Sequence, residues 1–456
     1  MTDRPAPQAW TRPRPSLALR AFLLVWSALW TIALPLILFY LRRRGRKDAL
    51  YAERIEERFG RYSSPLPDAI WVHAVSLGEM RSAVPMVRQM LDRGDRVVTT
   101  HFTPAGRRES ERVFAADIAT GRMRAVWVPL ELEWAWKRFF RAFTPRCGLV
   151  MEIEIWPRMV AAARSAGVPL FMCNAQYPFK SMTRDNGAPL QLRQQVMTQF
   201  AGALVKSDLQ RRRFEDIGLG NIAVTGELRF DQPIPPHLVT AGIAARHWLG
   251  ADTRRVITIA SAIENEDDTY LQAIATLREH HARAGLPMPL IVYVPRRPER
   301  FTEVEGHIQA AGLSVIRRSA LFDRALDPAA WGQAPDLPDV ILGDSLGEMY
   351  FYLAMSDQVI VGGGFNPKGA HNISESLVLM KPVLTGPHTG TIEYPFVEAE
   401  AAGVARSVRD ADALGQALIE GFGSDPARIQ AFLDAHAGGT ARTLAAIPRL
   451  IAAATP

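Results

Sequence analysis

The stretch Asp231–Val239 reads DQPIPPHLV and places three prolines within nine residues near the middle of the 456-residue chain. Proline lacks an amide hydrogen and interrupts helices and strands, so we interpret this stretch as a linker between two domains. On each side of it, short apolar runs alternate with amphipathic stretches of helical period. This alternation is typical of a parallel sheet covered by helices. The sequence therefore predicts two doubly wound, Rossmann-like α/β domains of similar size.

The apolar runs define the expected strands and the domain boundaries. Before the linker we expect strands at 69–74, 96–102, 125–130, 147–154, 168–175, 202–207 and 221–228, and after it at 256–262, 289–296, 314–318, 339–344, 358–363 and 382–386. The predicted parts are an N-terminal basic arm and membrane anchor (1–47), an acceptor-binding domain (48–230), a linker (231–245) and a nucleotide-sugar-binding domain (246–456), the binding roles resting on the resemblance described below. Two such halves joined by a linker resemble the GT-B architecture of glycosyltransferases, in which ligands are expected at the carboxyl ends of the strands.

The composition excludes several classes of protein. With 48% hydrophobic and 22% charged residues, the chain is neither disordered nor fibrous. Its two cysteines, Cys147 and Cys173, lie in no metal-binding or disulfide pattern, which argues against a zinc site and a disulfide-stapled fold and fits a reducing compartment.

The distribution of charge argues against a nucleic-acid partner. The first 65 residues hold 12 basic and five acidic side chains, whereas the remaining 391 hold 41 basic and 42 acidic ones. A nucleic-acid-binding protein would carry its basic groups over the folded body. A cationic N-terminus alone indicates a membrane surface as the partner.

The N-terminus also contains a hydrophobic segment. Ala21–Leu41 is 21 residues long without a charge, about the length that crosses a bilayer as a helix. Five basic residues follow it (Arg42, Arg43, Arg44, Arg46 and Lys47), which predicts that the later domains face the cytoplasm. Two alternatives remain open: a spanning or deeply inserted anchor, and a helix lying in the membrane interface with a kink at Pro35.

Three expected junctions between strand and helix share one short pattern, found at Ser76–Glu79, Ser345–Glu348 and Asn372–Glu375. Each is typical of a capping box, a purely structural device. Because all three fall at strand ends where ligands bind, a functional role is the alternative. Glu79 in particular is a candidate general base, since a carboxylate at this edge can accept the proton of an attacking hydroxyl.

Other strand ends carry groups suited to an anionic ligand. The basic cluster Pro295–Arg300 suits a phosphate or carboxylate, and the glycines of 362–364 and 369 let the backbone approach a ligand before a helix N-terminus. Glu375 is then placed to accept hydrogen bonds from a ribose. Glu152 and Glu154 alternate in an apolar strand end and are predicted on one face, either functional or paired with a neighbouring Arg or Lys.

These motifs together resemble the Kdo transferases, which move 3-deoxy-D-manno-octulosonic acid (Kdo) from CMP-Kdo to a lipid A precursor (lipid IVA) in lipopolysaccharide biosynthesis. Eleven features match in chain order: the basic anchor, Arg58–Gly60, His73–Glu79, Thr103–Gly106, Met151–Pro157, Asn174–Ala175, Thr225–Asp231, Ser261 with Glu264 and Glu266, Pro295–Arg300, Gly343–Glu348, and His371–Asn372 with Glu375.

The resemblance implies a function and residue roles. It implies an inverting, membrane-associated glycosyltransferase of the cell inner membrane, with Glu79 as general base, Glu152 supporting the transition state, and Arg229 in place of the usual lysine. The CMP-holding residues would be Pro295, Arg296, Leu346, Gly347, Glu348, Asn372, Ile373, Ser374 and Glu375. It also implies that the stretch from Asp425 folds back over the first domain. No cofactor is expected, and no metal either, since no acidic cluster calls for one.

The chain departs from the family pattern at several positions that are expected to line the donor and acceptor sites. Ala262 and Ile263 replace Thr-His, Arg297 replaces a histidine, Ala370 replaces a glycine, and Gln176-Tyr177-Pro178 replaces Arg-Leu-Ser. Two alternatives therefore stay open. One is a transferase using another CMP-ulosonic acid or a UDP-sugar, and the other is a non-catalytic, membrane-anchored relative.

Overall fold

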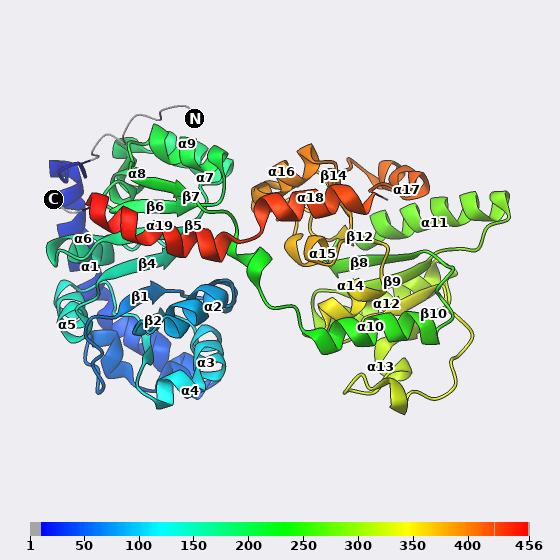
Figure 1. Cartoon of the computed structure of the whole chain (residues 1–456), viewed down its shortest axis with the longest axis horizontal. Helices are drawn as coiled ribbons and strands as arrows, with labels where there is room; N and C mark the ends of the chain where they lie inside the picture. The colour runs from blue at the N-terminus through cyan, green and yellow to red at the C-terminus, as the bar shows by residue number, and fades with distance from the viewer. Residues whose placement is uncertain (1–10, 424, 455–456) are drawn as a thin grey trace. The chain divides into compact units, whose positions relative to one another are not determined.

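The computed structural model describes residues 11–423 and 425–454. The chain is divided into two units, each with its own parallel sheet (Figure 1). Unit 1 comprises Met1–Gln232 and Ala437–Pro456, and unit 2 comprises Pro233–His436. Residues 1–10 of the predicted basic arm lie outside the described part of the chain.

Unit 1 is built on a parallel sheet of seven strands in the order β3-β2-β1-β4-β5-β6-β7. In β1, Trp71 lies in one hydrophobic core, whereas Ile70 and Val72 lie in the other. Successive side chains of a strand point to opposite faces, so both faces of this sheet are buried. The strands are β1 (Ile70–His73), β2 (Val97–His101), β3 (Met123–Trp127), β4 (Cys147–Met151), β5 (Leu170–Ala175), β6 (Gly202–Val205) and β7 (Ile222–Val224).

Helices cover both faces of this sheet. The core on the Trp71 face includes side chains of α5, α6 and α8, and the opposite core includes side chains of α2 and α19. The helices of unit 1 are α1 (Leu17–Gly45), α2 (Leu77–Asp92), α3 (Pro104–Val113), α4 (Ala115–Ala119), α5 (Glu133–Phe143), α6 (Pro157–Ser165), α7 (Phe179–Asn186), α8 (Leu192–Met197), α9 (Asp208–Asp216) and α19 (Gly439–Ala454), with 3-10 turns η1 (Ala49–Tyr51), η2 (Ile55–Phe59), η3 (Pro189–Gln191) and η4 (Leu228–Asp231).

Unit 2 repeats the architecture with a parallel sheet in the order β10-β11-β9-β8-β12-β13-β14. Its strands are β8 (Val256–Ala262), β9 (Leu290–Pro295), β10 (Val315–Arg317), β11 (Val340–Leu342), β12 (Gln358–Val361), β13 (Val383–Thr385) and β14 (Ala405–Ser407), the last of which the sequence analysis missed. Its helices are α10 (Pro236–Trp248), α11 (Asp267–Ala284), α12 (Phe301–Ala310), α13 (Arg318–Leu321), α14 (Met349–Met355), α15 (Ser374–Val378), α16 (Glu393–Ala401), α17 (Ala411–Glu420) and α18 (Pro426–His436), with 3-10 turns η5 (Pro298–Arg300), η6 (Pro328–Ala330) and η7 (Gly390–Ile392).

The linker is shorter than predicted. The units divide between Gln232 and Pro233, and helix α10 already begins at Pro236, so most of the predicted linker 231–245 is helical. The reason is that Pro236 occupies the first turn of α10, where a missing amide hydrogen costs no helical hydrogen bond.

The C-terminal boundary also differs from the prediction of one domain over 246–456. Helix α18 stays in unit 2, and the chain returns to unit 1 from Ala437 onward, not from Asp425. Asp231 fixes this return, because its carboxylate accepts hydrogen bonds from the backbone amides of Gly438 (2.7 Å) and Thr440 (2.5 Å). Leu444, Ile447 and Leu450 of α19 then complete the core against α2.

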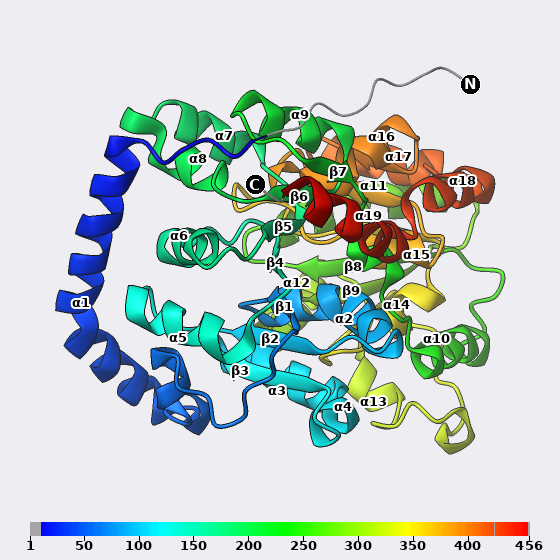
Figure 2. The same cartoon turned by 60° about the vertical axis from the view of Figure 1, so that its left-hand side comes forward.

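Helix α1, with 29 residues, is the one helix in the described part of the chain that is long and apolar enough to cross a membrane. It runs along the outside of unit 1 beside α5, α6 and α8 (Figure 2). Leu19 and Leu41, near its two ends, are each 1% exposed, so both ends of the helix pack against unit 1.

The docking of α19 yields a stability prediction. Leu444 is 6% exposed, so Leu444→Ala leaves a cavity and destabilises unit 1 by about 2–4 kcal/mol. We expect its thermal transition to fall by roughly 5–10 °C in scanning calorimetry. Leu286→Ala, at a side chain 53% exposed in unit 2, is the matched control and should change it by less than about 2 °C. Equal effects of the two variants would contradict the packing of α19.

Candidate functional site

Glu79 lies at the carboxyl edge of the unit 1 sheet, in the first turn of α2. Ser76 caps this helix and donates its hydroxyl to one carboxylate oxygen of Glu79 (2.7 Å), while the Val75 amide donates to the other (2.8 Å). The capping pattern predicted for Ser76–Glu79 is therefore present. It holds the carboxylate in one fixed orientation while leaving it 8% exposed.

The environment of Glu79 shifts its titration toward neutral pH. Burial, helped by the negative charges of Glu154 and Glu152, raises the pKa of Glu79 to about 7, against the hydrogen bonds from Ser76 and Val75, which lower it. A carboxyl group with such a pKa exchanges its proton near the working pH of a general base. Nearby His73 is fully buried and burial lowers its pKa to about 3, so it is a far weaker base.

Glu152 and Arg229 form an ion pair at the same edge. The Nη2 atom of Arg229 lies 2.9 Å from Oε1 of Glu152, and the Arg229 Nε donates to the hydroxyl of Ser82 on α2 (3.2 Å). The two predicted residues are thus brought together, and the paired interpretation of Glu152 holds with Arg229 as the partner.

The backbone at Glu152 differs from the prediction. Strand β4 ends at Met151 rather than Glu154, and Glu152 has a positive φ of 57°. The strand alternation used to place Glu152 and Glu154 on one face therefore does not apply. Glu154 instead accepts a hydrogen bond from the Trp156 indole (2.9 Å). A left-handed conformation at a non-glycine residue is a strained backbone state that is often found at functional sites.

A buried ion pair that the sequence analysis missed lies behind Arg229. The ammonium of Lys206 lies 2.8 Å from the carboxylate of Glu227, both almost inaccessible, and the Asn174 amide donates to the same carboxylate (2.8 Å). Burial raises the pKa of Glu227, but the charges of Lys206 and Arg229 outweigh it and lower the pKa. Glu227 also accepts the backbone amide of Arg229 (3.2 Å), so this cluster positions the arginine. The sequence signal that could have identified this ion pair is the position of Lys206 directly after strand β6, at the edge where ligands are expected.

In unit 2, Arg296 lies close enough to His371 to affect its titration. Burial and, to a smaller extent, the positive charge of Arg296 lower the pKa of His371 to about 4. Arg296 follows Pro295, the buried last residue of β9, and is exposed, without a carboxylate partner in the part of the chain that the structure describes. The Nε2 atom of His371 is buried without a hydrogen-bond partner there. This region thus offers a free cation and an unused polar atom.

The pattern Ser345–Glu348, which also contains the predicted nucleotide-binding residues Leu346, Gly347 and Glu348, does not form a capping box. Glu348 itself is the N-cap of α14 and caps no amide; its carboxylate pairs with Arg318 and accepts the Ser345 hydroxyl (2.5 Å). The reason is that Ser345 lies too far upstream of the helix, which begins at Met349. Leu346 is 67% exposed and Gly347 has a φ of 81°, so the segment forms a protruding turn.

The third predicted pattern, Asn372–Glu375, also differs from a capping box. Helix α15 begins at Ser374, and the Asn372 side chain accepts the Ser374 amide (3.0 Å), with Ile373 buried between them. The Ser374 hydroxyl is buried without a partner among the described residues. Glu375 lies in the first turn of α15 and raises the pKa of Tyr350 electrostatically, although burial is the larger cause.

The fully buried Glu266 holds the glycine-rich turn that follows strand β12. Its carboxylate accepts the amides of Gly363 (2.8 Å) and Phe365 (2.9 Å) and the hydroxyl of Tyr270 (3.0 Å). Of the positions that depart from the family pattern, Ala262, Ile263 and Ala370 are buried, and Arg297 pairs with Glu264 (2.9 Å).

One group of side chains in the described residues has the spacing of a metal site. It consists of Asp267, Glu303 and His307 in unit 2. The Asp267 carboxylate is already bonded to Arg300 and to the Tyr293 hydroxyl (2.5 Å), so the neighbouring cation neutralises it. None of the predicted site residues belongs to this group.

Comparison with known proteins identifies the family. A family model described as 3-deoxy-D-manno-octulosonic-acid transferase matches residues 53–232. A 3-deoxy-D-manno-octulosonic acid transferase of Bordetella pertussis is 40% identical over 445 residues, which cover 95% of this chain and 97% of the relative. This chain belongs to the Kdo transferase family. A Kdo transferase of Haemophilus influenzae is 30% identical over 86% of this chain and 89% of its own length.

Solved structures share the fold at low sequence identity. A glycosyltransferase from Rickettsia africae aligns with a TM-score of 0.56 at 11% identity, covering 86% of this chain and 99% of its own. A UDP-GlcNAc 2-epimerase from Neisseria meningitidis aligns with a TM-score of 0.53 at 14% identity, covering 84% of this chain and 99% of its own. The predicted GT-B fold is confirmed, and the chain is a glycosyltransferase of the Kdo family.

The raised pKa of Glu79 predicts how stability depends on pH. Its carboxyl group is most stable protonated, so its favourable contribution is complete below pH about 4.5 and is lost as pH rises through about 7. Glu79→Gln cannot ionise. We therefore expect it to be increasingly more stable than the parent protein above pH 5, by up to about 3 kcal/mol at pH 8.

Thermal midpoints of both proteins measured from pH 4.5 to pH 8 test this expectation. Glu133→Gln is the control, because Glu133 is exposed and its pKa is lowered by the hydrogen bond from Lys137. A Glu79→Gln difference that is constant with pH would contradict the burial of Glu79.

Proposed function

We propose that this protein transfers Kdo from CMP-Kdo to a hydroxyl group of a lipid A precursor in lipopolysaccharide assembly. The observation that carries the proposal is the buried, oriented carboxylate of Glu79 beside the Glu152–Arg229 ion pair, in a chain of this family. A base with a pKa near 7 suits a sugar hydroxyl as nucleophile.

The proposed reaction is a single displacement. The acceptor oxygen attacks the anomeric carbon of Kdo as its proton passes to Glu79. The bond from that carbon to the phosphate oxygen breaks, and CMP leaves with the electron pair, so the configuration at the anomeric carbon inverts. Arg229, held by Glu152 and Ser82, places a cation at the same edge to stabilise developing negative charge.

Unit 2 supplies the proposed donor site. Arg296 carries an exposed guanidinium for the phosphate of CMP, close to His371 and its unused Nε2 atom. Pro295, Leu346, Gly347 and Glu348 line the nucleotide, and Asn372, Ile373, Ser374 and Glu375 hold the ribose and phosphate. No metal or cofactor is part of the proposal, because arginine charges meet the phosphate directly.

The proposed location is the cytoplasmic face of the inner membrane. The support is the apolar helix α1, whose last turn bears Arg42, Arg43 and Arg44, with Arg46 and Lys47 directly after it; these cations are attracted to anionic lipid. At this surface the enzyme meets a lipid-linked acceptor.

The direct test of donor and acceptor is transfer by the detergent-solubilised protein, with CMP-Kdo generated in situ and a tetraacylated lipid A precursor, read by mass spectrometry. A mass increase of one or more Kdo units supports the proposal. Transfer with another CMP-ulosonic acid or a UDP-sugar would favour the donor alternative, and absence of nucleotide binding would favour a non-catalytic relative.

The base assignment predicts the effect of Glu79→Gln. The variant keeps the size of the side chain and loses only the proton acceptor, so we expect transfer to fall about 10³-fold with CMP affinity unchanged by calorimetry. In the parent protein, kcat/KM should rise with pH and level off above pH about 7. Near-parental transfer by Glu79→Gln would refute this role.

The Glu152–Arg229 pair predicts different effects for two substitutions. Arg229→Lys keeps the charge at the position where the family usually has lysine, and we expect activity within about tenfold of the parent. Arg229→Gln leaves Glu152 without its cation and should lose about 10²-fold or more. The same mass-spectrometric assay measures both, and equal losses would contradict an electrostatic role.

A further inference from the structure

Helix α1 has two faces that differ in their neighbours, although both are apolar. One face packs on unit 1: Phe22 and Leu23 contact the main core, and Trp30, Leu34 and Ile37 contact a small cluster around Leu130 and Leu132. The opposite face bears a stripe of large apolar side chains that are 55–76% exposed, namely Leu24, Val25, Leu29, Ile32, Leu36 and Phe39. We call these six residues the exposed stripe.

Specific hydrogen bonds hold α1 against unit 1 at several points. The Ser16 hydroxyl at its N-terminus donates to Gln195 (2.6 Å), and the Trp26 indole near its middle donates to Glu131 (3.0 Å). Glu131 is 1% exposed and also accepts the backbone amides of Arg158 (2.8 Å) and Met159 (3.0 Å) at the start of α6. The indole thus completes a buried network, and detaching α1 would leave a buried carboxylate oxygen with one donor fewer.

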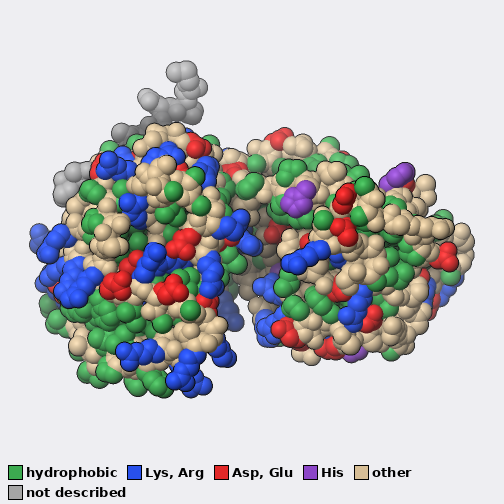
Figure 3. All heavy atoms as spheres, turned by 90° about the horizontal axis from the view of Figure 1, so that it is seen from below, with side chains coloured by type: hydrophobic (Ala, Val, Ile, Leu, Met, Phe, Trp, Pro, Cys, Tyr) green, Lys and Arg blue, Asp and Glu red, His purple; other side chains and the backbone are tan. Residues whose placement is uncertain are grey.

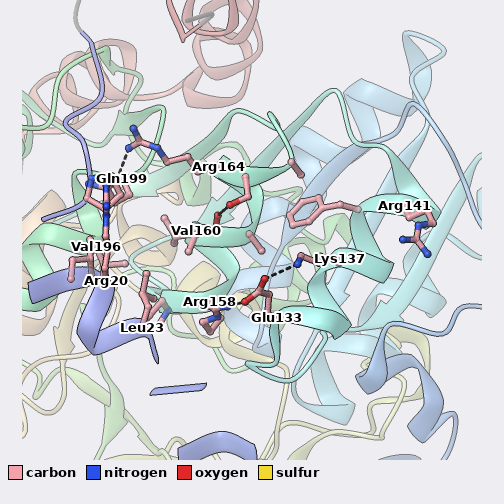
Figure 4. A pocket seen from close by; sticks show the side chains of 18 residues that line it. Arg20, Leu23, Glu133, Lys137, Arg141, Arg158, Val160, Arg164, Val196 and Gln199 are labelled. Atoms are coloured by element: carbon pink, nitrogen blue, oxygen red, sulfur yellow. Dashed lines mark hydrogen bonds and ion pairs between the residues drawn. The ribbon is translucent and has the colours of Figure 1, made fainter. Parts of the chain in front are cut away.

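A groove of about 740 Å³ lies beside the first turns of α1, bounded by α5, α6 and α8 (Figure 4). Leu19, Leu23 and Val160 give it apolar walls. Its lining also carries five cations and one carboxylate: Arg20, Lys137, Arg141, Arg158, Arg164 and Glu133. Glu133 pairs with Lys137 (2.7 Å) and Arg158, so Arg20 and Arg141 have no carboxylate partner among the described residues.

We propose that α1 lies in the plane of the membrane surface, with the exposed stripe in the acyl region and the groove cations at the phosphates of anionic lipids. The proposal rests on the membrane location proposed above and chooses between the two alternatives that the sequence leaves open.

Packing decides against a spanning orientation. Because α1 is packed against unit 1 from Leu19 to Leu41, a helix crossing the bilayer would carry the groove cations and Glu131 into hydrocarbon, or would lose all its contacts. Unpaired charges are costly there. An in-plane helix keeps every contact and covers only the exposed stripe.

Charge favours lipid over a second copy of this chain as the occupant. Arg20 lies at one end of the stripe, and Arg42, Arg43 and Arg44 lie at the other. Figure 3 shows hydrophobic side chains gathered on unit 1 with lysine and arginine side chains around them. Two such faces would repel each other, whereas an anionic membrane attracts both the apolar stripe and its basic border.

Sidedness of labelling tests the orientation. The natural cysteines Cys147 and Cys173 are buried and burial raises their pKa to about 12, so an introduced cysteine reacts alone. Thr11→Cys and Lys47→Cys mark the two ends of α1, and Leu286→Cys marks unit 2. In proteoliposomes treated with an impermeant maleimide, we expect all three to react from the same side. Protection of Thr11→Cys alone would establish a spanning helix and overturn the proposal.

Depth measurements test what covers the stripe. Bimane attached to Leu24→Cys and to Leu36→Cys should be quenched by brominated acyl chains to a similar extent, and bimane on Leu286→Cys should not. Absence of quenching, together with cross-links between stripe cysteines of two copies, would identify a dimer and overturn the proposal. Failure to bind vesicles at all would overturn the membrane location itself, independently of transferase activity.

The groove has its own test. The double variant Lys137→Glu with Arg141→Glu should weaken binding to phosphatidylglycerol-containing vesicles by about tenfold or more and leave binding to pure phosphatidylcholine unchanged. Arg283→Glu with Arg409→Glu, at exposed positions of unit 2, makes the same change in charge and is the control. Equal weakening by the two pairs would show that only net charge matters and would refute the groove.

Discussion

Buried glutamates join separate elements at the carboxyl edges of both sheets, and the site depends on how each of them is compensated. Glu131 accepts four N–H donors from α1, α5 and α6, and Glu266 accepts two amides of the glycine-rich turn. Glu227 has the ammonium of Lys206 in contact, which lowers its pKa. Glu79 receives two hydrogen bonds but pairs with no cation in the part of the chain that the structure describes, and it faces two other carboxylates. Burial, together with these neighbouring negative charges, raises its pKa to about 7, which fits the proposed role of Glu79 as general base.

Period and composition were sufficient to predict the two sheets, because strands buried on both faces are continuous apolar runs. The sequence missed only β14 in the described part of the chain, since Ala405–Ser407 is short and polar. The return of α19 to unit 1 could not be predicted from hydrophobic periodicity, because the pattern of an amphipathic helix does not show which surface the helix covers. In the structure, Asp231 fixes the position of this segment through hydrogen bonds to two backbone amides more than 200 residues later.

The site could be predicted residue by residue only where the chemistry is local. Ser76 and Glu79 lie one helical turn apart, so their hydrogen bond follows from spacing. The same spacing failed at Ser345–Glu348, because the helix starts one residue after Glu348 and the carboxylate turns to Arg318 instead. The pairing of Glu152 with Arg229 joins positions 77 residues apart, and only the folded sheet edge brings them together.

The substitution of arginine for the usual lysine fits this geometry. A guanidinium has several donors in a rigid plane, and here one nitrogen meets Glu152 while Nε meets Ser82 on α2. Arg229 thereby links the loop after β4 to the helix that carries Glu79, a link that the single ammonium of lysine makes less rigidly. Glu227 fixes the backbone amide of Arg229 from behind. Arg229 and the proposed base, Glu79, are therefore connected through Ser82 and helix α2.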